Sequence, residues 1–332
     1  MKIGKLLSVI LLLFAVSGCT KEDRSDCILE DNATFMFVLK DQDGIDRFAQ
    51  NIKMVDFVLF GEDGIMYSYN RLNESALSRF PGIKKTLPVG RYYAVCWGNV
   101  ADNSHFTGLN TGITNWNDCF IEIPSTATRT GDPIYYAPYK RNPYSRSADM
   151  PEERYTGDYT LWEIIIPHGS NTVKEMNFIR AHRTVNVYIK GLTDILGNVE
   201  YLPTIEAQNV WGKYNFFYET QDYRVNFIQQ TILKNIGNGT GLQEGEVQEN
   251  EVPIASATFH GGFGEIFSDI NLIVRKGSDG SIVHTVNLRQ FLLNNPEEDK
   301  NDVNILISFL DDFGVTVTVP DWDAGMVTPG VN

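Results

Sequence analysis

The residue types that most often carry chemistry, cysteine and histidine, are few and scattered in this chain of 332 residues with five histidines and four cysteines. No histidine belongs to a His-Glu-x-x-His pattern, which would put two metal ligands on one helical face. No Cys-x-x-Cys or mixed Cys/His spacing indicates zinc, and no Gly-x-Ser-x-Gly sequence presents a serine nucleophile. The sequence therefore predicts a protein that is not an enzyme and has no metal or cofactor.

Three polar segments remain as weaker candidates for a site. The acids Asp41, Asp43 and Asp46 alternate, but the glycine at position 44 comes too early for an EF-hand, so a turn is favoured over a calcium site. The glycine-rich residues 237–241 lack the Lys-Ser/Thr that holds a phosphate and magnesium. The acidic residues 297–302 are typical of a solvated loop. None of the three predicts catalysis.

One cysteine, Cys19, has a position that indicates chemistry. Residues 1–5 carry Lys2 and Lys5, and residues 6–16 are apolar except for Ser8. This run is too short to cross a membrane as a helix, which needs roughly 20 apolar residues, so it predicts a cleaved secretory signal. Its end, Val-Ser-Gly followed by Cys19, resembles the lipobox of bacterial lipoproteins. That resemblance implies a mature chain that begins at an acylated Cys19.

The residues behind Cys19 extend this resemblance. Positions 20–23 read Thr-Lys-Glu-Asp, which is similar to the export tag of Bacteroidetes lipoproteins and implies the outer face of the outer membrane; a solvated polar tether explains them equally well. The formal net charge of −14 repels nucleic acid and anionic lipid. We therefore expect a lipid-anchored, surface-exposed protein that does not bind nucleic acid.

The other three cysteines lie in a compartment where disulfides persist. Cys96 stands in a β-rich run, where a lone buried thiol is a common core filler. Cys27 and Cys119 flank expected strands and are the better pair for a possible disulfide, although a bridge and two free thiols are equally compatible with the sequence.

Short runs of aromatic and β-branched residues, separated by Gly, Asn, Asp and Pro, dominate the mature sequence. Residues 52–60 and 65–69 flank a Gly-Glu-Asp-Gly hairpin signal at 61–64. Residues 184–190 and 315–319 alternate with the period of a strand. Only residues 288–294, and less clearly 74–80, indicate short helices. Amphipathic helices between strands are missing, so two successive β-sandwiches are favoured over βαβ units.

The expected organisation follows from these runs. We assign residues 1–18 to the signal, 19–30 to a lipidated tether, 31–168 to one β-sandwich and 169–332 to another. Residues 101–158 lose the strand pattern and predict mainly surface connections. The boundary is placed between residues 167 and 171, where turn residues interrupt strand patterns on both sides.

Several segments in order resemble a known family. Behind Cys19 come residues 24–27 (Arg-Ser-Asp-Cys), 55–60 (Val-Asp-Phe-Val-Leu-Phe), 90–99 (Gly-Arg-Tyr-Tyr-Ala-Val-Cys-Trp-Gly-Asn), 180–192 and 315–322. This order is similar to the Bacteroidales FimB-like anchor and accessory subunits of type V pili over nearly the whole chain. The resemblance implies two tandem transthyretin-like (Ig-like) β-sandwiches and an outer-membrane lipoprotein that contacts fimbrial shaft subunits, the fimbrillins, and limits the growth or loss of the pilus.

The same resemblance raises the question of proteolysis. Shaft subunits of the family lose an N-terminal strand to an arginine-specific protease and accept a partner's strand in the vacated groove, which is β-strand addition. Arg24 lies so near Cys19 that cleavage there would free the protein from its lipid. Only ten residues follow Trp322, so a long donor strand is not expected, and an end position suits the chain better than a repeating shaft position.

Two rival functions stay open at this stage. A surface lipoprotein could bind glycans or host protein through Trp116 and the aromatic loop from Tyr135 to Tyr155. An orphan surface hydrolase is a third interpretation, with no motif in its favour. The tryptophans lie mostly within β-patterned runs, where packing is the commoner role.

Overall fold

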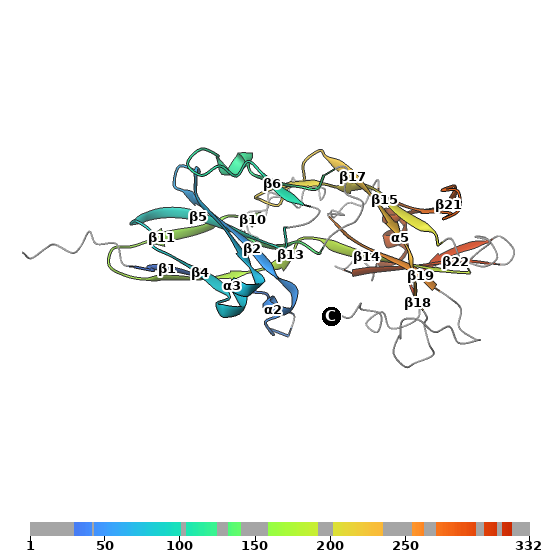
Figure 1. Cartoon of the computed structure of the whole chain (residues 1–332), viewed down its shortest axis with the longest axis horizontal. Coiled ribbons are helices and arrows are strands. Elements are labelled where there is room, and N and C mark those ends of the chain that lie inside the picture. Colours follow the sequence, from blue (N-terminus) through green and yellow to red (C-terminus); the bar gives the residue numbers. More distant parts are fainter. Residues whose placement is uncertain are drawn as a thin grey trace, which may run out of the picture.

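The structure is a computed structural model. It describes residues 30–41, 43–100, 104–124, 132–140, 159–191, 202–234, 254–261, 270–296, 302–310 and 314–320. Nearly all of its regular elements are strands, arranged as two sandwiches placed end to end (Figure 1). The predicted all-β architecture of two tandem sandwiches is confirmed.

The first half of the chain forms two facing sheets. One has the order β12-β1-β4, with β12 (Thr172–Asn177) parallel to β1 (Ala33–Val38) and β4 (Gly82–Lys85) antiparallel to it. The other has the order β13-β8-β5-β2-β3, and β11 also pairs with β5. Its strands are β13 (Ile179–Arg180), β8 (Tyr135–Ala137), β5 (Gly90–Gly98), β2 (Met54–Gly61), β3 (Met66–Asn73) and β11 (Trp162–Ile166).

The second half repeats the two-sheet plan. A five-stranded sheet has the order β18 (Ile232–Lys234), β19 (Ile254–Gly261), β14 (Arg183–Lys190), β22 (Asp302–Phe309) and β23 (Val315–Thr318). A four-stranded sheet has the order β17 (Arg224–Gln230), β15 (Thr204–Trp211), β20 (Asn271–Arg275) and β21 (Ile282–Asn287). Within the first sheet β14 is parallel to β22 and antiparallel to β19.

The strand alternation explains how the central sheet of the first half is buried on both faces. Along β2, Val55, Phe57 and Leu59 pack into the core between the two sheets. Val58 and Phe60 point to the opposite face and join a second apolar cluster. Because side chains of a strand alternate between faces, a run of six buried residues requires cover on both sides. The second cover comes from residues 104–124 and from the second half of the chain.

The expected local elements are found at the predicted places. The two helices are α3 (Glu74–Arg79) and α5 (Leu288–Asn294), each capped by an asparagine side chain that accepts from the backbone three residues on, Asn73 from Ala76 and Asn287 from Gln290. In β23 the two valines are half-buried against the core and the two threonines are exposed, as predicted. A short helix, α2 (Phe48–Asn51), was not predicted.

Strand pairing moves the proposed junction between the halves. The sequence placed it at residues 167–171, but β12 and β13, which follow that point, hydrogen bond with β1 and β8 of the first half. Only Ala181 and His182 separate β13 from β14, the first strand of the second half. The turn signal at 167–171 belongs to a connection inside the first sandwich, so we now propose the junction at residues 181–182.

A separate three-stranded sheet joins the two halves directly. β6 (His105–Thr107) and β7 (Phe120–Glu122) come from the first half, and β16 (Lys213–Asn215) comes from the second, in the order β16-β7-β6. The backbone continues this contact, since the Ile123 N–H donates to the Gly212 carbonyl at 2.8 Å. Residues 104–124, expected to be mainly surface connection, therefore also contribute to the junction.

Aromatic rings continue the junction into the core of the first half. Phe216 follows β16, has no exposed surface, and lies among Phe60, Trp97 and Phe106 with ring centroids 5.8 to 6.4 Å away. The Tyr136 hydroxyl donates to the Phe216 carbonyl at 2.9 Å. A segment of the second half is thus held inside an apolar cluster of the first.

Candidate binding surfaces

The predicted lipidation and disulfide residues are only partly within the described chain. Cys19, Cys27 and Arg24 lie outside the described residues. Cys119 is fully buried, with Sγ 3.5 Å from the Asn115 carbonyl oxygen, and its burial raises the pKa of the thiol to about 12. The Cys27–Cys119 bridge stays a prediction, and it would require Cys27 to reach a side chain that has no exposed surface.

Cys96 stands in β5, and its side chain lies on the opposite face of the β13-β8-β5-β2-β3 sheet from Cys119. Its side chain packs in the core between the two sheets of the first half, whereas Cys119 packs in the cluster on the outer face. Burial raises the pKa of the Cys96 thiol well above its usual value. Neither thiol is therefore poised as a nucleophile, because the reactive form is the thiolate.

Three of the aromatic residues suggested for glycan binding are packed against other rings or buried in a strand. Trp116 packs edge-on against Tyr93 and Phe60, with centroids 5.0 and 6.1 Å apart. Tyr135 and Tyr136 form β8 and are buried. Trp116, Tyr135 and Tyr136 therefore do not form an exposed glycan platform, whereas Tyr139 of the same loop is 49% exposed. Most of the rest of the proposed loop, from residue 141 to Tyr155, lies outside the described residues.

The acidic turn at 41–46 directs its carboxylates onto its own backbone. Asp41 Oδ1 accepts from the N–H groups of Asp43 and Ile45, and its Oδ2 accepts from Arg47 Nε at 3.0 Å. Asp46 Oδ1 accepts from the N–H groups of Leu39 and Phe48. These bonds use the oxygens that a calcium ion would need. Among the described residues, no group of His, Cys, Asp or Glu side chains could hold a metal ion.

The buried acids are likewise occupied by structural pairs. Asp56 is fully buried and accepts from Arg71 Nε at 2.7 Å and from the Tyr69 hydroxyl at 2.6 Å, and desolvation raises its pKa against these bonds. Glu206 is bound by two guanidinium nitrogens of Arg275, at 2.9 and 2.7 Å. Asp56 and Glu206 are therefore occupied by structural partners, and removal of either arginine would leave an uncompensated buried charge.

Two histidines at the junction are an unpredicted feature. His182 is buried, and neither of its ring nitrogens has a hydrogen-bond partner among the described residues. Burial, then His260 and Arg180, lowers its pKa to about 3. Burial and Arg180 lower the pKa of His260 to about 4, although His260 Nδ1 lies 2.9 Å from Thr184 Oγ1. Nothing in the local sequence signals this burial, which arises from docking of the second half.

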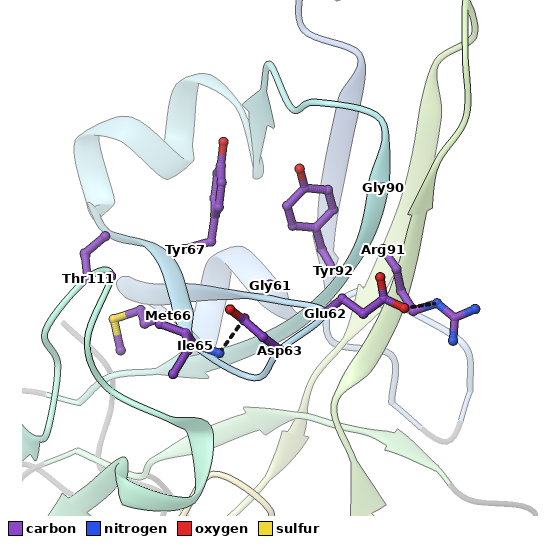
Figure 2. Close-up of a pocket in the computed structure, with 11 residues that line it drawn as sticks. Gly61, Glu62, Asp63, Ile65, Met66, Tyr67, Gly90, Arg91, Tyr92 and Thr111 are labelled. Carbon is purple, nitrogen blue, oxygen red and sulfur yellow. Dashed lines mark hydrogen bonds and ion pairs between the residues drawn. The ribbon is translucent and has the colours of Figure 1, made fainter.

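A hollow of about 590 Å³ lies where the β2–β3 hairpin meets the start of β5 (Figure 2). Its walls are the turn at residues 61–65, the start of β5 and the turn at Thr111 and Gly112. The rings of Tyr67 and Tyr92 stand side by side, edge to face, with centroids 5.3 Å apart. Arg91 faces Glu62, with Nε 3.8 Å from Oε1.

Free strand edges are the other surfaces available to a partner. In the pairing of the described strands, β12 and β4 border one sheet of the first half, and β18, β23, β17 and β21 border the sheets of the second. An edge strand exposes a row of N–H and C=O groups that can pair with another chain. None of the helices in the described part of the chain is long and apolar enough to cross a membrane.

The described chain thus forms two tandem open β-sandwiches with free strand edges. The family described as fimbrillin-A associated anchor proteins Mfa1 and Mfa2 matches residues 31–324. The chain belongs to this family, and the predicted resemblance to fimbrial anchor subunits is confirmed.

Solved structures show the same fold at low identity. A Bacteroides ovatus protein named as an adhesin candidate has a TM-score of 0.62 and 14% identity, covering 87% of this chain and 94% of that one. The fimbrial anchor protein Mfa2 from Porphyromonas gingivalis has a TM-score of 0.54 and 15% identity, covering 86% and 94%. A Bacteroides thetaiotaomicron protein named as a candidate for polysaccharide binding has a TM-score of 0.59 and 12% identity, covering 86% and 95%. None of the curated proteins matches the chain.

Proposed function

We propose that this protein is an outer-membrane lipoprotein that anchors a fimbrial shaft, held by acyl chains on Cys19 and bound to a fimbrillin by backbone strand pairing. Membership of the anchor family carries the proposal. The lipobox-like sequence before Cys19 supplies the tether, since two or more acyl chains make a stable membrane anchor.

The direction of the first strand supports this arrangement. β1 runs parallel to β12, and β12 leads through β13 into the second half. The chain therefore begins β1 at the end of the first sandwich that points away from the second (Figure 1). Asn32 fixes this end, because its side chain exchanges two hydrogen bonds with the Leu87 backbone, at 2.7 and 2.9 Å. A lipid on Cys19 would place the second sandwich outermost.

The occupied position of β1 also bears on how the partner binds. β1 lies between β12 and β4, both of which pair with it, so the place that a shaft subunit would vacate is filled. Cleavage at Arg24 would remove the lipid but leave β1 attached, because β1 begins at Ala33. We therefore assign the fimbrillin contact to a free edge of the second half.

Substitution of Cys19 tests the tether. We expect Cys19→Ala to move the protein from the membrane fraction into the soluble fraction, because no thiol remains at the lipobox position. Fractionation with a palmitate label measures both effects, and Cys96→Ala is the matched control that should keep label and location. Unchanged membrane association of Cys19→Ala would contradict the tether.

Photo-cross-linking in cells tests the partner. Photoreactive residues at Thr316 (β23), Ile282 (β21) and Ile228 (β17) probe the second half, and one at Val173 (β12) is the control in the first. We expect fimbrillin adducts from at least one of the first three positions. Gene deletion should change fimbrial length or release fimbriae into the medium. Normal attached fimbriae with no fimbrillin adduct at any position would reject the anchor function.

A further inference from the structure

We propose that the hollow between the β2–β3 hairpin and the start of β5 binds a neutral carbohydrate chain. The shape of the hollow and the charges that line it carry the proposal, which does not depend on the anchor function. It also differs from the sequence-based glycan hypothesis, whose residues Trp116, Tyr135 and Tyr136 are packed in the structure.

Backbone hydrogen bonds hold the walls of the hollow in place. In the hairpin turn, Gly64 N–H donates to the Gly61 carbonyl at 3.0 Å, and Gly64 has a φ of +79°, which glycine adopts without strain. The second wall is attached to β3, because Gly112 N–H donates to the Met66 carbonyl at 2.7 Å and Met66 N–H donates to the Thr114 carbonyl at 2.9 Å. A ligand would therefore meet a formed site and would not have to order these loops.

Tyr67 is the accessible aromatic side chain of the hollow, and Tyr92 holds it in position. Tyr67 is 43% exposed, whereas Tyr92 is 6% exposed. Tyr92 is fixed by a hydrogen bond from its hydroxyl to the Pro88 carbonyl at 3.1 Å, and its ring packs edge to face with Tyr67. Figure 2 shows the two rings side by side; Tyr67 comes from β3 and Tyr92 from β5, the strands on either side of β2. An exposed ring held in this way offers an apolar face to the C–H groups of a pyranose and a hydroxyl to its polar groups.

The charges decide which ligand fits. Glu62, Asp63 and Arg91 line the hollow, and Arg91 also pairs with Glu163, with Nη1 3.1 Å from Oε1. The carboxylates outnumber the guanidinium, so an anionic ligand is repelled. Carboxylates accept hydrogen bonds and a guanidinium donates them, which together match sugar hydroxyls that do both. The volume of about 590 Å³ lies within the range of small-molecule sites.

A glycan array probed with the fluorescently labelled full chain, purified in detergent, tests the proposal. We expect binding to neutral oligosaccharides and binding at least about tenfold weaker to their sulfated or sialylated counterparts. Titration calorimetry with a neutral oligosaccharide from the array then measures variants. Tyr67→Ala should weaken binding by about tenfold, because it removes the stacking surface. Tyr139→Ala, which removes a tyrosine of similar exposure (49%) outside the hollow, should leave binding unchanged.

A second variant separates binding from folding. Thr111→Trp adds a large side chain to an exposed wall residue and should abolish binding by filling the hollow while the unfolding midpoint stays that of the natural chain. The proposal is overturned if no neutral glycan binds, if anionic glycans bind as tightly, or if well-folded Tyr67→Ala and Thr111→Trp variants retain full affinity.

Discussion

Phe216→Ala is expected to lower the free energy of unfolding by about 3–5 kcal/mol and to uncouple the two sandwiches. The ring has no exposed surface, and it belongs to the second half while its neighbours Phe60, Trp97 and Phe106 belong to the first. Truncation would leave a cavity at the junction. Guanidinium unfolding followed by circular dichroism should change from one transition to two.

Phe227→Ala is the matched control for this effect. Phe227 is equally buried, but its cluster is the core of the second sandwich. Phe227→Ala should lower the free energy of unfolding by a similar amount without loosening the junction. Spin labels on Ser78→Cys in α3 and Arg289→Cys in α5 report the distribution of distances between the halves. This distribution should broaden in Phe216→Ala and stay narrow in Phe227→Ala. An equally narrow distance distribution in both variants would contradict the junction role of Phe216.

Acidification is expected to destabilise the protein through His182 and His260. Their pKa values in the folded protein, about 3 and about 4, lie below the ordinary value of 6.5. At pH values between the folded pKa values and 6.5, the unfolded chain binds more protons than the folded one. The contribution of the two neutral histidines to the free energy of unfolding is therefore complete above pH 6.5 and is lost as the pH falls toward their pKa values in the folded protein. Each histidine accounts for roughly 1.4 kcal/mol per pH unit, so the two together remove roughly 5 kcal/mol between pH 6.5 and 4.5.

The groups around these rings place the effect at the junction. His182 lies beside Tyr214 of the second half, with ring centroids 6.1 Å apart. Arg180 of β13 pairs with Asp302 of β22 at 2.8 Å and also donates to Thr184, which contacts His260. Burial is the main reason that the charged form of His182 is disfavoured, and the positive charges of His260 and of the partly buried Arg180 add to it.

Urea unfolding at several pH values measures this dependence. His182→Phe should reduce the loss between pH 6.5 and 4.5 to about half, because one of the two titrating groups is gone. His105→Phe, a change at an exposed histidine on β6, should leave the loss as it is in the natural chain. If His182→Phe showed the same loss as the natural chain, protonation of His182 would not be the cause.

Local features of this fold were predictable because they depend on neighbours in sequence. The Gly-Glu-Asp-Gly signal gave the β2–β3 turn, and the periodicity of residues 288–294 gave α5. The hollow was not predictable, because its walls come from residues 61–67, 90–92 and 111–112, which no single pattern connects. The burial of Tyr136 was not predictable either, because a strand pattern does not reveal that other segments cover the outer face of its sheet.

The order of β-rich segments was enough to predict the family, since it is a linear pattern, and the lipid on Cys19 stays a prediction from the same kind of pattern. Only the tertiary structure decided which strands pair. The parallel contact of β1 with β12 joins residues about 140 positions apart, and the contact of β7 with β16 joins the two halves. Alternation fixes which face of a strand is apolar, but the partner of each edge depends on long-range geometry. For the same reason, the burial of His182 and Phe216 follows from docking of the two sandwiches and not from their neighbours in sequence.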